Sequence, residues 1–164
     1  MSDVPASSQL ARLRAKAAAA RQAQHVDCHL EPVGVVVRYG PLTTDQIDDV
    51  RRRGKSGARE NVSVLVEACQ AVLIVDDDGQ LVSIDPDATC FVDSDGVLQG
   101  DPVTFSSSRL AELLEADSAA GLVDMLYGLA GRSLQIARDA DDVIYLSRGE
   151  TRRMSRPMRA GSGR

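Results

Sequence analysis

The residues best suited to metal chemistry stand near the start of the chain, where His25, Cys28 and His29 fall within five positions. A zinc site needs four ligands, and the remaining candidates (Cys69, Cys90 and scattered acids) supply no second pair at a defined spacing. In an alternating strand, moreover, Cys28 and His29 point to opposite faces. We therefore interpret both histidines as solvent-facing side chains and predict neither a metal site nor a cofactor.

Two acidic turns, Asp-Asp-Asp-Gly at 76–79 and Asp-Ser-Asp-Gly at 93–96, are candidate calcium sites. An EF-hand loop requires oxygen ligands at alternate positions, glycine at the sixth position and glutamate at the twelfth. In the first turn Leu81 is sixth and Asp87 is twelfth, and in the second turn Val97 is fifth. Neither turn fits, whereas Asp-Gly is a common turn dipeptide.

Catalytic and phosphate-binding motifs are the remaining chemical possibilities. The three serines at 106–108 lie at a helix entry, where capping accounts for them, and no G-x-S-x-G surrounds them. The Gly-Lys-Ser-Gly run at 54–57 lacks the upstream glycine of a phosphate-binding loop and follows a predicted helix. Both histidines lie near the N-terminus, so no His–acid–nucleophile set can be nominated. We predict that the protein is not an enzyme.

Charge is distributed unevenly along the chain, whose net charge is −5. Residues 1–24 balance at +3 and residues 148–164 at +5, so the body between them carries −13. Basic arms of this kind are usually solvated tails, and an acidic body repels phosphate. Nucleic acid binding through the arms is therefore the weakest of the functions that we consider.

Cysteine usage and hydropathy bear on the compartment. The three cysteines are an odd number without a close pair, which favours a reducing environment. We expect no signal peptide, because residues 1–10 are polar and alanine and arginine follow them. No run of 18 apolar residues occurs, so we expect no membrane-spanning helix.

Hydrophobic periodicity predicts helices at residues 8–24, 43–54, 58–75, 106–116, 118–129 and 134–147. Alternating residues at 25–30 and β-branched residues at 35–39 predict a short hairpin. Residues 80–84 are a candidate strand, and residues 85–104 a loop or second hairpin. At the second helix, Thr43 and Gln46 have the spacing of a capping box.

The predicted helices at 58–75 and 118–129 carry the strongest apolar stripes. Such a stripe serves either the core or a partner, and we favour the core for residues 58–75 because apolar residues are so dense there. The residues of the candidate partner-binding or core stripe are Val62, Leu65, Val66, Cys69, Leu73, Leu122, Met125 and Leu126.

These elements predict a mainly α fold with a small β-hairpin or sheet element (α+β), arranged as a single compact helical domain with flexible ends. The predicted divisions are a charged N-terminal helical arm (1–24), a mainly helical core domain with an N-terminal β-hairpin (25–148) and a disordered arginine-rich tail (149–164).

Five features occur in order along the chain: a charged N-terminal helix, VVVRYGPLTTD at 35–45, LVEAC at 65–69 running into DDDG at 76–79, LAEL at 110–113 and VDMLYG at 123–128. Together they resemble the tail assembly chaperones of long-tailed bacteriophages that infect actinobacteria. In element order the resemblance covers roughly residues 10 to 148, and the Asp/Pro/Gly-rich insert at 85–104 is longer than the family leads us to expect.

The resemblance implies a protein that binds and solubilises the tape measure protein in the host cell cytoplasm and is absent from the mature virion. Expected partners are the tape measure protein, the tail tube protein, a longer form of the chain itself made by ribosomal frameshifting, and further copies in a homo-oligomer. The alternative is a structural virion component, such as a connector or tail completion subunit.

Overall fold

The computed structural model describes residues 6–54, 57–131 and 134–149. Its helices are α1 (Ala6–Ala23), the short 3-10 helix η1 (Glu31–Val33), α2 (Thr44–Arg53), α3 (Ala58–Ala68), α4 (Ser108–Leu113), α5 (Ala119–Leu129) and α6 (Gln135–Ser147). Its strands are β1 (Val26–Leu30), β2 (Val35–Tyr39), β3 (Cys69–Val75), β4 (Leu81–Ser83), β5 (Phe91–Val92) and β6 (Leu98–Gln99).

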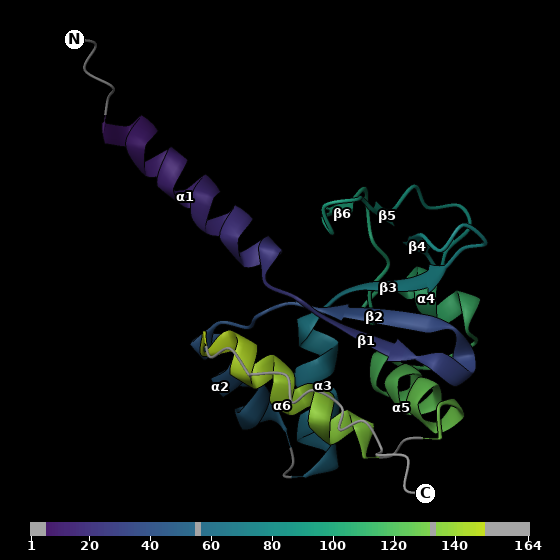
Figure 1. Cartoon of the computed structure of the whole chain (residues 1–164). Helices are drawn as coiled ribbons and strands as arrows, with labels where there is room; N and C mark the ends of the chain where they lie inside the picture. Colours follow the sequence, from purple (N-terminus) through teal and green to yellow (C-terminus); the bar gives the residue numbers. More distant parts are fainter. Residues whose placement is uncertain (1–5, 55–56, 132–133, 150–164) are drawn as a thin grey trace, which may run out of the picture.

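The described strands form one six-stranded sheet in the order β1-β2-β3-β4-β5-β6, and every neighbouring pair is antiparallel. Helices α2 and α3 are inserted between β2 and β3. In Figure 1, α2, α3, α5 and α6 lie together on one side of β1–β3, while β4, β5 and β6 lie on the other side. Helix α1 extends away from this body.

The hairpin of β1 and β2 confirms the sequence prediction. Val26 lies opposite Tyr39 and Leu30 opposite Val35, and Gly34 closes the connection with a φ of 69°. Positive φ suits glycine because it has no Cβ. Strand β2 is buried along its whole length, as its β-branched residues favour.

The predicted capping box at the start of α2 is also confirmed. The Thr43 hydroxyl accepts a hydrogen bond from the Gln46 amide at 3.2 Å, and the Gln46 side chain accepts one from the Thr43 amide at 2.9 Å. These bonds satisfy two amides that the helix itself leaves unpaired. Three arginines occupy the last turn, where they complement the helix dipole.

The sheet separates two apolar clusters. The larger lies between the sheet and the helices and includes Leu65, Leu126 and Val143. The smaller consists of Val36, Ala71, Leu73, Cys90 and Val92, and its β2 and β3 residues alternate with Val37 and Val72 of the larger cluster. Both faces of β2 and β3 are therefore covered, which explains why these strands are mostly apolar, with Arg38 and Gln70 as the exceptions.

The prediction of a mainly α fold is wrong. The fold is α+β, with a six-stranded antiparallel sheet at its centre instead of a small hairpin element. The candidate strand at 80–84 is confirmed as β4, and of the two alternatives for 85–104 the structure has the hairpin, β5 with β6. The predicted extent of the sheet was too small because β3, which joins these strands to β2, was predicted as part of a helix.

The main error is the helix predicted at 58–75. Helix α3 ends at Ala68, and residues 69–75 form β3, paired with β2 and β4. The run Val72-Leu-Ile-Val75 is rich in β-branched residues, which favour strands. A run that is apolar on every side satisfies helical and strand periods alike.

Candidate protein-binding surface

The His/Cys group near the N-terminus is divided between the two faces of β1. Cys28 is buried, whereas His29 is exposed, as the strand alternation predicts. The His25 Nε2 atom lies 3.8 Å from an Asp27 carboxylate oxygen, and no hydrogen bond reaches its Nδ1 atom. Over the residues that the structure describes, no three His, Cys, Asp or Glu side chains come together as a metal site would require.

The two acidic turns have the same internal hydrogen bonding. One Asp76 carboxylate oxygen accepts from the amides of Asp78 and Gln80, at 3.0 and 2.8 Å. Asp93 accepts in the same way from Asp95 and Val97, at 3.0 and 2.9 Å. These bonds close the β3–β4 and β5–β6 connections and lower the pKa of Asp93, chiefly through the Val97 amide. Each leading aspartate thus serves its own turn.

The serine and Gly-Lys-Ser predictions have different outcomes. Ser107 occupies the N-cap of α4, but its side chain makes no capping hydrogen bond, so capping does not explain the serine run. At α5, by contrast, the Ser118 hydroxyl accepts from the Gly121 amide at 3.1 Å. Residues 55 and 56, the Lys-Ser of the other motif, lie outside the described residues.

A chain of buried polar groups crosses the main core. The Tyr127 hydroxyl donates to Asp139 Oδ2, so the Tyr39 hydroxyl, 2.9 Å away, donates to Tyr127. The Gln135 side chain donates to Asp139 Oδ1 at 2.5 Å. Cys28 is hydrogen-bonded to the same carboxyl. This chain joins β1, β2, α5 and α6, and Asp139 is only 1% exposed.

Burial determines the ionisation of these groups. It raises the pKa of Asp139, an effect that the donated hydrogen bonds of Tyr127 and Gln135 partly offset. Burial and the nearby Asp139 carboxyl also raise the pKa of Cys28 and of Tyr127. A thiol or phenol with a raised pKa is a weak nucleophile at neutral pH. The geometry is that of a structural link within the core.

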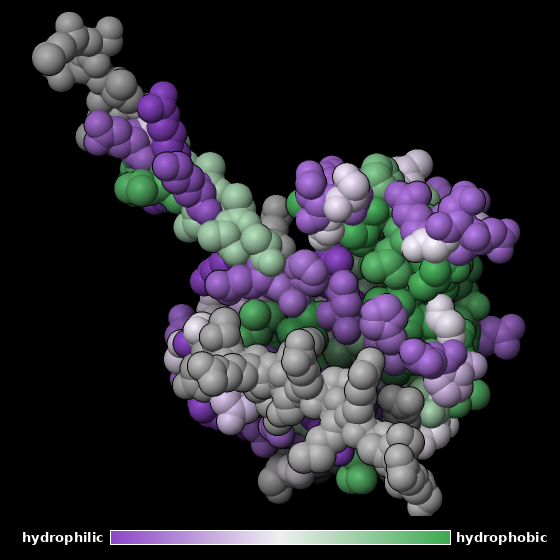
Figure 2. Space-filling model, viewed as in Figure 1, coloured by the Kyte–Doolittle hydropathy of each residue, from purple (hydrophilic) through white to green (hydrophobic). Residues whose placement is uncertain are grey.

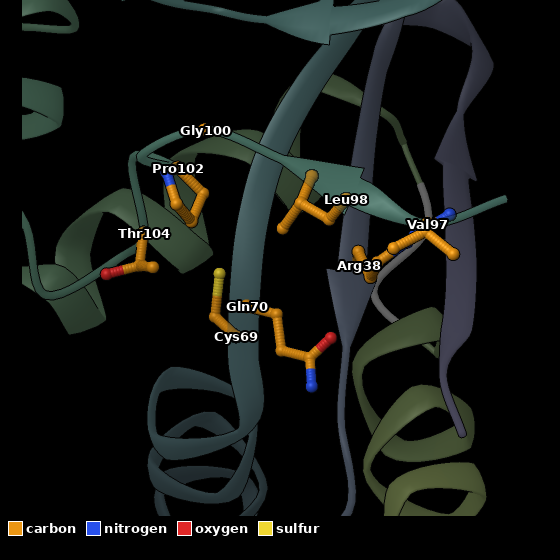
Figure 3. A pocket seen from close by; sticks show the side chains of 8 residues that line it. All are labelled: Arg38, Cys69, Gln70, Val97, Leu98, Gly100, Pro102 and Thr104. Atoms are coloured by element: carbon orange, nitrogen blue, oxygen red, sulfur yellow. The ribbon is translucent and has the colours of Figure 1, made fainter. Parts of the chain in front are cut away.

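A cavity of about 310 Å³ opens beside the start of β3 (Figure 3). Its lining is Arg38, Cys69, Gln70, Val97, Leu98, Gly100, Pro102 and Thr104. Burial raises the pKa of Cys69 to about 12, so its thiol stays protonated. The Arg38 guanidinium donates to both Asp27 oxygens, at 2.8 and 2.9 Å, and to the Gly96 carbonyl at 2.8 Å. Arg38 is therefore a cross-link between the two hairpins.

The residues of the predicted stripe lie mainly in the core. Six of the eight are buried and two, Val66 and Met125, are partly exposed. Cys69 and Leu73 belong to different clusters, although residues four apart in a regular strand share a face. The pairing of β2 with β3 shifts register between Arg38 and Tyr39, which interrupts the alternation next to Cys69. The buried members are Val62, Leu65, Cys69, Leu73, Leu122 and Leu126. The structure thus separates residues that helical spacing had placed on one stripe.

Helix α1 is the element whose side chains are most available to a partner. Every side chain from Gln9 to Arg21 is exposed, including Leu10 at 49% and Leu13 at 63%. Figure 2 shows hydrophilic and hydrophobic residues side by side on this helix, which stands clear of the body. Its four charged residues are all basic. The sequence predicted this helix as part of a charged N-terminal arm.

No protein-family model, curated protein or solved structure matches the chain. The resemblance to tail assembly chaperones therefore rests on the residues that carry it, and the functions that it implies are proposals. None of the helices that the structure describes is both long and apolar enough to cross a membrane.

Proposed function

We propose that the protein is a phage tail assembly chaperone, which binds the helical tape measure protein and keeps it soluble until the tail tube assembles around it. The observation that carries the proposal is α1, a basic helix whose side chains from Gln9 to Arg21 are all exposed to solvent beside an acidic body. Helices in proteins gain most of their stability from packing of a face. A helix without such packing in its own chain is suited to packing on another.

The charge distribution supports the same function. A net charge of −13 over residues 25–147 favours solubility, which a protein needs if it is to hold an aggregation-prone partner in solution. The core is closed by aliphatic packing on both sides of the sheet, so binding a partner through α1 leaves the fold of the body intact.

Co-expression with a tape measure protein tests the proposal. The soluble fraction of the tape measure protein should rise when the chain is present, and the two should co-purify. A tape measure protein that is equally soluble without the chain would refute the proposal. Mass spectrometry of purified particles is the second measurement, since a chaperone should be missing from them and a structural component should be present.

A further inference from the structure

The two large apolar residues of α1, Leu10 and Leu13, have the a and d spacing of a heptad, and two of its eight alanines continue that spacing. Leu10, Leu13, Ala17 and Ala20 are spaced by three, four and three residues, the a and d spacing of a coiled coil. Successive residues of an α-helix turn by about 100°, so these four side chains form one stripe along the helix. Both leucines of the stripe are exposed in the structure.

Basic residues flank this stripe on both sides. With Leu10 as an a position, Arg14 and Arg21 are e positions and Lys16 is a g position. The helix from Ala6 to Ala23 contains no acidic residue to balance them. Charges at e and g positions determine which helix can lie alongside.

These charges disfavour pairing of α1 with the α1 of a second copy. In a parallel pair, Lys16 of one helix would face Arg21 of the other, and both are positive. In an antiparallel pair, e positions face e positions, so arginine would face arginine. Either arrangement places like charges together, which is how coiled coils exclude unwanted partners.

Nucleic acid explains the surface less well. A helix that binds phosphates gains nothing from exposed leucines between its basic residues, and basic side chains lie on both sides of the stripe. The remaining face carries mainly alanines, among them Ala15 and Ala19, and one further basic residue, Arg12 at a c position.

We propose that α1 is one half of a heteromeric coiled coil, whose other half is a partner helix with apolar a and d residues and Glu or Asp at the e and g positions. The leucines would define the N-terminal part of the seam. Over Ala17 and Ala20 the seam is shallow, so larger partner side chains fit there. The inference rests on the proposed protein-binding function and adds to it the chemistry of the partner.

The test uses the full-length protein and a fluorescein-labelled 21-residue peptide with Leu at a and d and Glu at e and g. Fluorescence anisotropy should show binding that weakens as salt increases. Two control peptides carry either Lys at e and g or Ser at a and d, and neither should bind. Equal binding of the Ser peptide would overturn the inference, because charge alone would then be sufficient.

Matched variants locate the surface. Leu10→Ser combined with Leu13→Ser should weaken binding of the Glu peptide by at least about tenfold, whereas Ala15→Ser with Ala19→Ser, on the opposite face, should leave it unchanged. Arg14→Glu with Arg21→Glu should lose the Glu peptide and gain the Lys peptide. Unchanged binding in the leucine variant would refute the coiled coil.

Two other occupants give distinct results. Equal or tighter binding of a 20-base-pair DNA duplex, lost in the arginine variant, would assign α1 to nucleic acid instead. A dimer in sedimentation that disappears in the leucine variant would assign it to a second copy. A Glu peptide that binds while a tape measure protein does not would overturn the proposed function alone, and the reverse result would overturn this inference alone.

Discussion

Asp139 is the most deeply buried carboxyl among the residues that the structure describes. It lies in the core, receives hydrogen bonds from Tyr127 and Gln135, and joins α6 to α5 through a direct side-chain contact. A buried carboxyl is tolerated only when its oxygens are satisfied, and each oxygen here has a donor. The arrangement positions the two helices relative to each other and to the β1–β2 hairpin.

The raised pKa of Asp139 makes part of the stability depend on pH. Burial favours the protonated form of Asp139. The contribution of this residue to folding stability is therefore fully present below the unfolded-state pKa of about 3.9, and it is lost as pH rises through the higher folded-state pKa. Asp139→Asn removes this titration. Relative to wild type, the variant should therefore become progressively more stable between acidic and neutral pH.

Urea unfolding at a series of pH values measures this difference. Arg109 lowers the pKa of Asp85, which adds stability as pH rises, but this contribution is common to both proteins and cancels. Asp124→Asn, on the exposed side of α5, is the control for loss of a carboxylate. A constant difference between Asp139→Asn and wild type at every pH would contradict the assignment.

Arg38 connects two hairpins that are far apart in sequence. It is 3% exposed and reaches both the Asp27 carboxylate of β1 and the Gly96 carbonyl of the β5–β6 turn. Arg38→Met keeps much of the side-chain length but removes these bonds. We expect a loss of about 2–3 kcal/mol of unfolding free energy.

Amide exchange identifies where this loss occurs. In Arg38→Met, exchange should accelerate at residues 92–98 more than in α3, because the Gly96 contact holds that turn against β2. Arg138→Met, at an exposed position of α6, is the matched control. Uniform acceleration across the chain would show that Arg38 supports the whole core instead of this connection.

Elements with local signals could be predicted from the sequence. The β1–β2 hairpin, the capping box of α2 and the helices α1, α5 and α6 all occur where periodicity and caps placed them. Strand β3 could not, because its identity depends on pairing with β2, which is distant in sequence. The buried polar chain was missed for the same reason: its residues are scattered from β1 to α6, and only the fold brings them together.

Helix α3 carries the clearest packing prediction. Leu65 is fully buried between the sheet and α5 and α6, whereas Glu67 on the same helix is exposed. Leu65→Ala should reduce the unfolding free energy by about 2–5 kcal/mol through the lost apolar contacts and the cavity left behind. Glu67→Ala should change it by less than about 0.5 kcal/mol.

Chemical denaturation of both variants measures these effects. The same stripe could instead have served a partner, in which case Leu65→Ala would leave stability unchanged and abolish partner binding. If Leu65→Ala has the same unfolding free energy as the wild-type protein, the placement of this residue in the core is contradicted.

At the scale of the whole molecule, the division between acidic and basic segments coincides with the division between packed and unpacked ones. The acidic body contains both apolar clusters, whereas α1 is basic and contributes to neither. Leu10 and Leu13 remain exposed to water. The fold therefore lacks the free energy that burying these two side chains would contribute. The division supports the proposal that α1 binds a partner.

Deletion of residues 1–24 tests this division. The remaining chain keeps every residue of both clusters, and its net charge becomes −8. Because α1 buries no side chain between Gln9 and Arg21, the melting temperature should stay within about 2 °C of the full-length value at the same ionic strength.

Leu65→Ala in the full-length chain is the reference for genuine loss of core packing. A decrease as large as that of Leu65→Ala would show that α1 packs on the body, and its leucines would then be core residues that no partner could reach. An unchanged melt together with loss of the Glu-peptide binding described above would assign α1 to recognition alone.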